Sequence, residues 1–215
     1  VFGNGMLLSA PLCLVGAFNH LHIFIDPEPN AAASFKERQR LFDLPRSGWT
    51  DYNAKLISKG GGIFNRSAKS ITISTDMKKR FDITENTLTP NQLLSTILKA
   101  RVDLLWNGGI GTYAKARSES HLDVGDKAND AIRINGVALR CRTVGEGGNL
   151  GMTQLARVEF NTHGGVCFTD FIDNAGGVNC SDVEVNIKIL LNQLLEKGKL
   201  TTKSRVKLLS QMTDD

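Results

Sequence analysis

Three short apolar segments of the sequence each run into a loop rich in glycine and asparagine. The segments, which we predict to be strands, cover residues 102–106, 139–144 and 166–172. The loops that follow them cover residues 107–111, 145–149 and 173–177. Helical patterns lie between the strands, and this alternation predicts an α/β domain with a mostly parallel sheet and helices on both faces. In such sheets ligands bind at the carboxyl ends of the strands, so the three loops are expected to line one crevice.

Other segments give local predictions. His22–Ile25 is predicted to be a buried strand that stops at Asp26 and Pro27. Asn30 is expected to cap a helix through about Phe42, with Phe35, Leu41 and Phe42 facing inward. Thr89, Pro90 and Gln92 form a strong helix start. Further helices are predicted over 126–134 and from a capping box at Ser181 and Glu184, whereas 46–89, with a possible strand at 70–74, is expected to be an irregular excursion from the core.

Composition excludes several classes of protein. The 215 residues are 41% hydrophobic, which is too apolar for a disordered chain, and no apolar run approaches the length of a membrane span. The net charge of +4 is weak for a nucleic-acid binder. Segment 66–80 carries five basic residues against one acidic residue, and it is either a solvated face or a patch for anions. We therefore expect no nucleic-acid partner and no membrane.

The cysteines do not form a metal or disulfide pattern. Cys13, Cys141, Cys167 and Cys180 include no CxxC pair, and no histidine stands at zinc-site spacing from them. No metal site is expected, and free thiols favour a reducing compartment, so we predict a cytoplasmic protein.

The start of the chain suggests a dinucleotide site. If a strand precedes Gly3-Asn4-Gly5, these residues form the turn into the first helix of a Rossmann-like fold, where glycines let the backbone approach a pyrophosphate. Asp26 follows Gly5 by about 20 residues, the separation at which an acidic residue holds the adenosine ribose. The alternatives are a tight turn without a ligand and a solvated carboxylate before Pro27.

The asparagines of the other loops are further candidates. Asn107 with Gly108, Asn149 and Asn174 can offer amide donors and acceptors to a carboxamide or a ribose, although asparagine and glycine also serve plain turns. Ser181 either caps the last helix or meets an anionic substrate at that helix terminus. Glu146 is the nearest acid–base candidate, and we interpret it as structural.

These residues occur in segments that resemble NAD-dependent glutamate dehydrogenases, and in detail the very large bacterial subclass. The resemblance covers essentially the whole chain. The most specific of the matching segments are Asp103–Tyr113, Val144–Gly151 and Asp173–Val178, and the others are Val1–Ser9, His22–Pro27, Asp43–Ser47 and Leu56–Gly62.

The resemblance implies that this region is the nucleotide-binding half of a catalytic core. By this resemblance, Gly3 and Gly5 match the dinucleotide turn, and Asp26 matches the acidic residue that selects NAD over NADP. Asn107 and Gly108 match a loop beside the cofactor, while Asn149 and Asn174 match asparagines near the nicotinamide. Ser181 matches a serine that contacts the substrate's side-chain carboxylate. Val1 and Met6 stand where smaller enzymes of the family carry glycine, and Gly148 replaces their alanine, which we expect to be a mild change.

The family's first Rossmann strand and its catalytic lysine and aspartate find no match in this sequence, so we expect a fragment that is inactive alone. The predicted division is an NAD-binding domain over 1–180 and a helical segment over 181–215 that closes the catalytic core. The full enzyme would interconvert L-glutamate and 2-oxoglutarate with NAD, and we expect it to be a homo-oligomer. The alternative function is a non-catalytic nucleotide-binding or regulatory module.

Overall fold

The computed structural model describes residues 5–212, so Gly3 and Asn4 of the predicted dinucleotide turn lie outside the described residues. The strands are β1 (Gly16–Phe18), β2 (His22–Ile25), β3 (Gly62–Asn65), β4 (Ile71–Thr72), β5 (Thr87–Leu88), β6 (Leu104–Asn107), β7 (Ala114–Lys115), β8 (Ile134–Asn135), β9 (Thr143–Glu146) and β10 (Val166–Cys167). The α-helices are α1 (Ala31–Asp43), α2 (Thr75–Phe81), α3 (Pro90–Leu98), α4 (His121–Val124), α5 (Gln154–Thr162), α6 (Asp170–Asp173), α7 (Ala175–Asn179), α8 (Val185–Glu196) and α9 (Thr202–Gln211). Short 3-10 helices occupy Gly5–Leu8, Trp49–Asp51, Ala54–Leu56, Lys127–Asn129 and Gly136–Ala138, and a π-helical segment occupies Cys180–Glu184.

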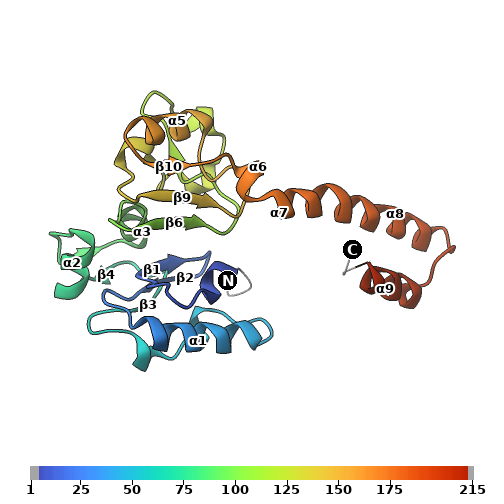
Figure 1. Ribbon diagram of the computed structural model, residues 1–215, viewed down its shortest axis with the longest axis horizontal. Coiled ribbons are helices and arrows are strands. Elements are labelled where there is room, and N and C mark those ends of the chain that lie inside the picture. Colours follow the sequence, from blue (N-terminus) through green and yellow to red (C-terminus); the bar gives the residue numbers. More distant parts are fainter. Residues whose placement is uncertain (1–4, 213–215) are drawn as a thin grey trace.

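Two lobes lie one above the other, each built on a small three-stranded sheet (Figure 1). The lower sheet has the order β1-β2-β3 and is antiparallel throughout. The predicted strand at His22–Ile25 is therefore confirmed, and it is the central strand of this sheet. Below it lies α1, which begins as expected, because the Asn30 side chain accepts a hydrogen bond from the Ala33 amide. Phe42, expected to face inward, is instead 45% exposed in the last turn of α1.

One face of the lower sheet is closed by aromatic side chains. Phe24 stacks on Trp49 with ring centroids 4.6 Å apart, and Tyr52 lies 5.0 Å from the same Phe24 ring. Leu41 of α1 completes this buried cluster. Burial of these large rings stabilises this face of the lobe.

The segment 46–89, expected to be an irregular excursion, supplies part of the main core. It forms β3, β4, α2 and β5, and its possible strand at 70–74 is found as β4. Six of its apolar side chains are buried with those of β2 and α3, namely Ile71, Ile73, Met77, Phe81, Ile83 and Leu88. The expectation was wrong because the short elements here have few residues each, so their periodicity in sequence is weak although their packing is tight.

The upper sheet has the order β10-β9-β6 and is parallel. Helix α5 connects β9 to β10, which is the parallel crossover that the alternating pattern predicted. The α/β class is thus confirmed. The described residues form two separate three-stranded sheets and two two-stranded sheets, however, and not the single doubly wound sheet that was predicted.

The stretch between β6 and β9 differs from expectation. Residues 126–134, predicted to be a helix, form only the 3-10 turn Lys127–Asn129 and the start of β8, which pairs with β7. The buried Arg133 side chain donates to the carbonyl oxygens of Thr112 and Asp126. These hydrogen bonds hold this stretch in a non-helical conformation, although its local pattern favours a helix.

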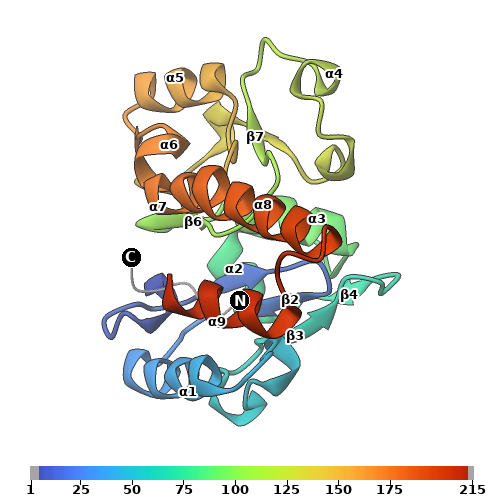
Figure 2. The same cartoon turned by 90° about the vertical axis from the view of Figure 1, so that its right-hand side faces the viewer.

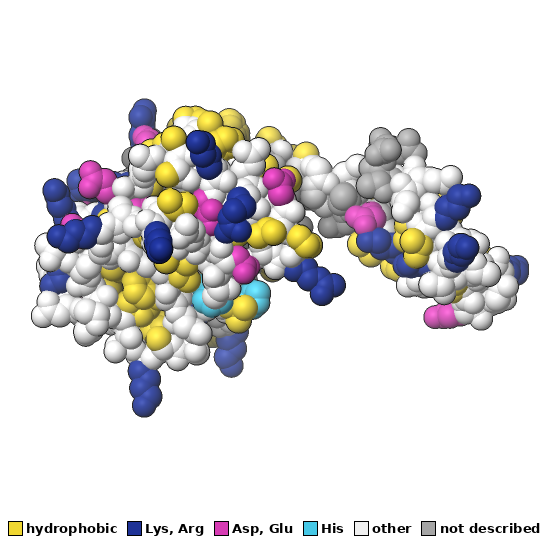
Figure 3. Space-filling view, turned by 90° about the horizontal axis from the view of Figure 1, so that it is seen from below, with side chains coloured by type: hydrophobic (Ala, Val, Ile, Leu, Met, Phe, Trp, Pro, Cys, Tyr) yellow, Lys and Arg dark blue, Asp and Glu magenta, His cyan; other side chains and the backbone are white. Residues whose placement is uncertain are grey.

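The C-terminal part is a helical arm that leaves the upper lobe (Figures 1 and 2). Helices α7 and α8 continue into one another through the π-helical segment, and α9 folds back beside α8. Ser181 therefore lies inside a continuous helix and does not cap one, which corrects the predicted capping box. Figure 3 shows this arm standing apart from the body, with hydrophobic and basic side chains on the same surface. No described helix is long and apolar enough to cross a membrane.

Candidate functional site

The carboxyl ends of β6, β9 and β10 bring the asparagine loops together. Asn107 at the end of β6 is in register with Glu146 at the end of β9, and the Gly147 amide donates to the Asn107 carbonyl at 2.8 Å. The loop after β10 contains α6 and ends at Asn174. These loops lie at the same edge of the sheet, because parallel strands place their carboxyl ends on the same side. Of the three, only the loop 107–111 contributes residues to the cleft between the lobes, so a crevice lined by all three is not confirmed.

Two of the predicted cofactor residues touch each other. The Asn174 Nδ2 donates a hydrogen bond to the Asn149 Oδ1 at 2.6 Å, although the residues are 25 positions apart. This bond leaves the Asn149 amide nitrogen and the Asn174 amide oxygen without a described partner. The pair therefore presents both donors and an acceptor, which is the complement of a carboxamide.

Asn107 contributes a further free donor to this edge. Its Nδ2 atom is buried and has no hydrogen-bond partner among the described residues. A Cβ atom at Gly151 would overlap this amide, so only glycine lets the returning loop pass over it. A buried amide without a partner is costly, and a ligand acceptor would remove that cost.

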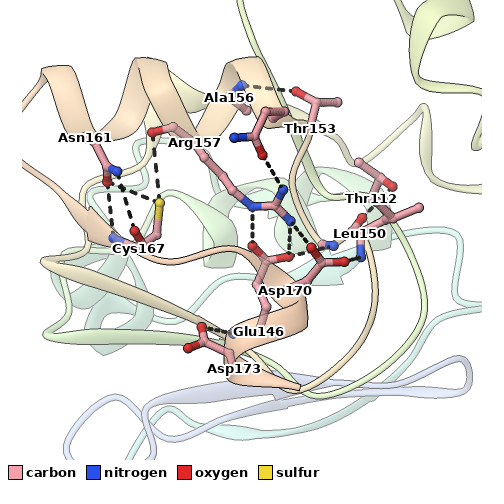
Figure 4. Close-up of polar contacts among 12 residues, drawn as sticks. Thr112, Glu146, Leu150, Thr153, Ala156, Arg157, Asn161, Cys167, Asp170 and Asp173 are labelled. Atoms are coloured by element: carbon pink, nitrogen blue, oxygen red, sulfur yellow. Dashed lines mark hydrogen bonds and ion pairs between the residues drawn. The ribbon is translucent and has the colours of Figure 1, made fainter. Parts of the chain in front are cut away.

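Glu146 is held by an arginine and does not face the edge as a free acid (Figure 4). Its Oε1 accepts from Arg157 Nε at 2.8 Å, and its Oε2 accepts from the second guanidinium nitrogen at 3.0 Å. Burial opposes the charge of Arg157, but the bonds to Glu146 and the charge of Asp170 outweigh it and raise the pKa of the guanidinium. This pairing supports the structural interpretation of Glu146.

Asp26 directly follows β2 in the lower lobe, and only one of its two carboxylate oxygens has a hydrogen-bond partner among the described residues. Its Oδ1 accepts from the Ser58 amide at 3.1 Å and also from the Ser58 hydroxyl. Its Oδ2 is buried and has no partner among the described residues, and the whole residue is only 1% exposed. The alternative of a solvated carboxylate before Pro27 therefore does not describe Asp26.

A cleft of about 1540 Å³ separates the two lobes. Strand β1 and the preceding residues line one wall, and β6 with the loop Asn107–Ile110 lines the other. Among the predicted site residues, Asn107 and Gly108 line this cleft, whereas Asp26, Asn149 and Asn174 do not.

The remaining predicted site residues, Gly5 and Ser181, lie in other elements of the chain. Gly5 is the first residue of the 3-10 helix Gly5–Leu8, where a longer helix was expected. Ser181 lies in the π-helical segment of the arm. The part of the chain that the structure describes holds no group of three or more histidine, cysteine, aspartate or glutamate side chains suited to a metal ion.

Comparisons with known proteins show the family of the chain. Residues 1–215 match the family described as bacterial NAD-glutamate dehydrogenase, catalytic domain. The chain belongs to this family.

Relatives from three bacteria are each named NAD-specific glutamate dehydrogenase. The protein from Pseudomonas aeruginosa is 68% identical over 214 residues, which cover 100% of this chain and 13% of that protein. The protein from Halomonas elongata is 65% identical over 215 residues, with 100% and 13% covered. The protein from Mycobacterium tuberculosis is 52% identical over 221 residues, with 100% and 14% covered. The chain thus spans about one seventh of the length of these relatives.

Several residues of this member of the family escaped the sequence analysis. Ser58, Arg157, Asp170 and Asp173 hold the candidate residues in place, yet each bonds a residue that is at least 11 positions away in the sequence. The only hint of these contacts in the sequence was the glycine run after Ser58. A Cβ at Gly61 would lie 2.5 Å from the Ile25 carbonyl oxygen, so glycine there lets this segment lie close to the end of β2.

The space available at Gly148 also differs from expectation. An alanine at this position was expected to be a mild change, but a Cβ there would lie 2.5 Å from the carbonyl oxygen of Gly109. The loops after β6 and β9 are packed backbone against backbone at this point, so the glycine is required by the close approach.

Proposed function

We propose that this chain supplies the NAD-binding half of an enzyme that oxidatively deaminates L-glutamate to 2-oxoglutarate and ammonia. The observation that carries the proposal is the Asn149–Asn174 pair beside Asn107, which offers donors and an acceptor at the carboxyl edge of a parallel sheet. The names of the relatives support the same activity.

The residues present fit the cofactor at both ends. At the nicotinamide end, the asparagine pair and the free Asn107 Nδ2 can bind the carboxamide and the adjacent ribose. At the adenosine end, the buried Asp26 Oδ2 lacks a donor, and a ribose hydroxyl would supply one. A 2′-phosphate there would meet a carboxylate, which favours NAD over NADP.

The cofactor, when bound, supplies the hydride acceptor. The described residues of this chain bind and orient, and Glu146, the nearest acid–base candidate, is paired with Arg157. We propose that a lysine and an aspartate outside this chain supply the acid–base chemistry and that the chain alone is inactive. Ser181 remains a proposed contact to the substrate carboxylate.

We further propose that the two sheets are halves of one Rossmann-like sheet. Strands β1 and β6 lie at the facing edges of the two sheets and line opposite walls of the same cleft (Figure 1). A strand from outside this chain, inserted between them, would satisfy both edges and join the sheets. Residues 1–180 would then be the NAD-binding domain, and 181–215 would close the catalytic core.

Two further properties belong to the proposal. We propose that the enzyme is cytoplasmic, since its cysteines are unpaired among the described residues. We also propose that the full-length enzyme is a homo-oligomer.

Calorimetric titration of NAD into the full-length protein tests the proposed function. We expect saturable binding that Asp26→Ala weakens, and turnover of glutamate by the full-length protein but not by this chain. Binding of NAD without any turnover of glutamate would instead favour a non-catalytic nucleotide-binding module. Absence of NAD binding by the folded protein would overturn the proposal.

A further inference from the structure

Arg157 of α5 binds two carboxylates from different elements, Glu146 of β9 and Asp170 of α6 (Figure 4). Its guanidinium makes the two bonds to Glu146 at 2.8 and 3.0 Å and a third bond to Asp170 Oδ1 at 3.1 Å. Arg157 is 5% exposed and Glu146 is fully buried. A planar fork that meets a carboxylate in this bidentate way fixes orientation as well as charge.

Both carboxylates in turn hold the backbone of the loop after β9. The second oxygen of the Glu146 pair accepts from the Gly151 amide at 2.8 Å, and Asp170 Oδ2 accepts from the Leu150 amide at 2.8 Å. Leu150 has a φ of 56°, in the left-handed region that a leucine rarely adopts. Its amide bond to Asp170 helps to keep it there, and Asn149 is the residue directly before it.

The same contacts fix the other half of the asparagine pair. Asp170 is the first residue of α6, and the Asn174 amide donates to the Asp170 carbonyl at 2.7 Å where the helix ends. Asp173 of the same turn accepts from the Glu146 amide at 3.1 Å. Short chains of bonds therefore connect Arg157 to Asn149 on one side and to Asn174 on the other.

We propose that Arg157 is a positioning residue for the nicotinamide end of the cofactor site. It sets the loop after β9 and helix α6 at the separation that brings Asn149 and Asn174 into contact. It is not a catalytic residue, since four of its five guanidinium N–H groups are bonded to Glu146, Asp170 and Gln154. This inference rests on the proposed function, because it assigns the asparagine pair to the nicotinamide.

The test compares two probes in the full-length protein by calorimetry. NAD reaches both ends of the site, whereas ADP reaches only the adenosine end. The variants are Arg157→Lys, Arg157→Met and the double variant Arg157→Met with Glu146→Gln, which avoids leaving a buried charge unpaired. Arg142→Met is the matched control, because Arg142 lies at the opposite end of the same sheet and its side chain is 83% exposed.

We expect the Arg157→Met variants to lose on the order of tenfold to a hundredfold in NAD affinity, as misplaced binding groups do, while ADP affinity stays unchanged. Arg157→Lys should recover part of the loss, because it keeps the charge but not the fork. Arg142→Met should match the parent protein with both probes.

Other results would overturn the inference. Equal losses for NAD and ADP, or unchanged NAD binding in the folded double variant, would show that Arg157 is only structural. The same conclusion would follow if no Arg157 variant, Arg157→Lys included, remained folded by circular dichroism. Failure of the parent protein to bind NAD would overturn the proposed function itself and this inference with it.

Discussion

Ser58 donates two hydrogen bonds to one oxygen of Asp26, from its amide at 3.1 Å and from its hydroxyl, across 32 residues of sequence. The same hydroxyl accepts from the Glu28 amide at 3.0 Å, so it both donates and accepts. The carboxylate is thereby fixed with Oδ1 satisfied and Oδ2 left over. A single serine thus decides which oxygen of Asp26 is left without a partner among the described residues.

Ser58→Ala should weaken NAD binding, because Asp26 would lose the hydroxyl that orients it. A hydrogen bond to a charged group contributes about 1.5 kcal/mol, which corresponds to roughly tenfold in affinity. Calorimetry with both NAD and ADP should show the loss, since Asp26 belongs to the adenosine end. Ser67→Ala is the control, because Ser67 is exposed and its side chain bonds only Asn65. Equal affinities in Ser58→Ala and Ser67→Ala would contradict the role of Ser58.

Gly148→Ala should destabilise the protein, whereas Gly109→Ala should not. A Cβ at Gly148 would lie 2.5 Å from the Gly109 carbonyl oxygen, but a Cβ at Gly109 would meet nothing within 4 Å. Forcing extra atoms into a close backbone contact typically costs about 1 to 3 kcal/mol. Urea titration of both variants measures this difference, and the idea fails if the two unfold at the same urea concentration.

The protein should lose stability in acid when Asp126 becomes protonated. Burial alone would raise the pKa of this carboxyl, but hydrogen bonds from Asn129 and from the Thr112 amide, with the charge of Arg133, lower it below its ordinary value of 3.8. A group whose pKa is lower in the folded state adds stability above its unfolded pKa and loses it as pH falls through the folded pKa.

Asp126→Asn should therefore flatten the fall in unfolding free energy below about pH 4. Asp103→Asn is the control, because the Asp103 side chain is 90% exposed and pairs only loosely with Arg142 at 3.5 Å. Melting temperatures measured between pH 3 and pH 7 distinguish the two variants, and parallel curves for Asp126→Asn and the parent would refute the prediction.

The cysteines should differ sharply in reactivity. Burial raises the pKa of the Cys141 thiol to about 11, so almost no thiolate forms at neutral pH, whereas Cys13 is exposed. Alkylation with iodoacetamide at pH 7, followed by peptide mass mapping, should label Cys13 quickly and Cys141 only after denaturation. Rapid labelling of Cys141 in the folded protein would contradict the packing around it.

Local chemistry allowed much of the secondary structure to be predicted from the sequence. The capping side chains of Asn30 and Thr89 bond the amides of Ala33 and Gln92, and the helices begin where those residues predict. The apolar face of α3 is buried as its spacing indicates. These predictions succeed because each depends on residues only three or four positions apart.

The failures share a different cause. Ser181 carries a capping signal, but a cap contributes only about 1 kcal/mol, and the chain is already helical from Ala175. Residues 126–134 have a helical pattern, but Ile134 is held in β8 by pairing with Ala114. In both places contacts formed in the folded chain outweigh a weak local preference.

By itself, the sequence determined the α/β class, the placement of Asn107 at the end of β6 and of Asn149 just after β9, and the family to which the chain belongs. Asn174, predicted to follow a strand over 166–172, instead directly follows α6, because β10 stops at Cys167. Tertiary structure alone decided that Asn149 meets Asn174, that Arg157 aligns their loops, and that Ser58 leaves one oxygen of Asp26 free. The physical reason is that these are directional bonds between side chains far apart in the chain. No local pattern encodes them, and they form only when packing has fixed the backbone on both sides.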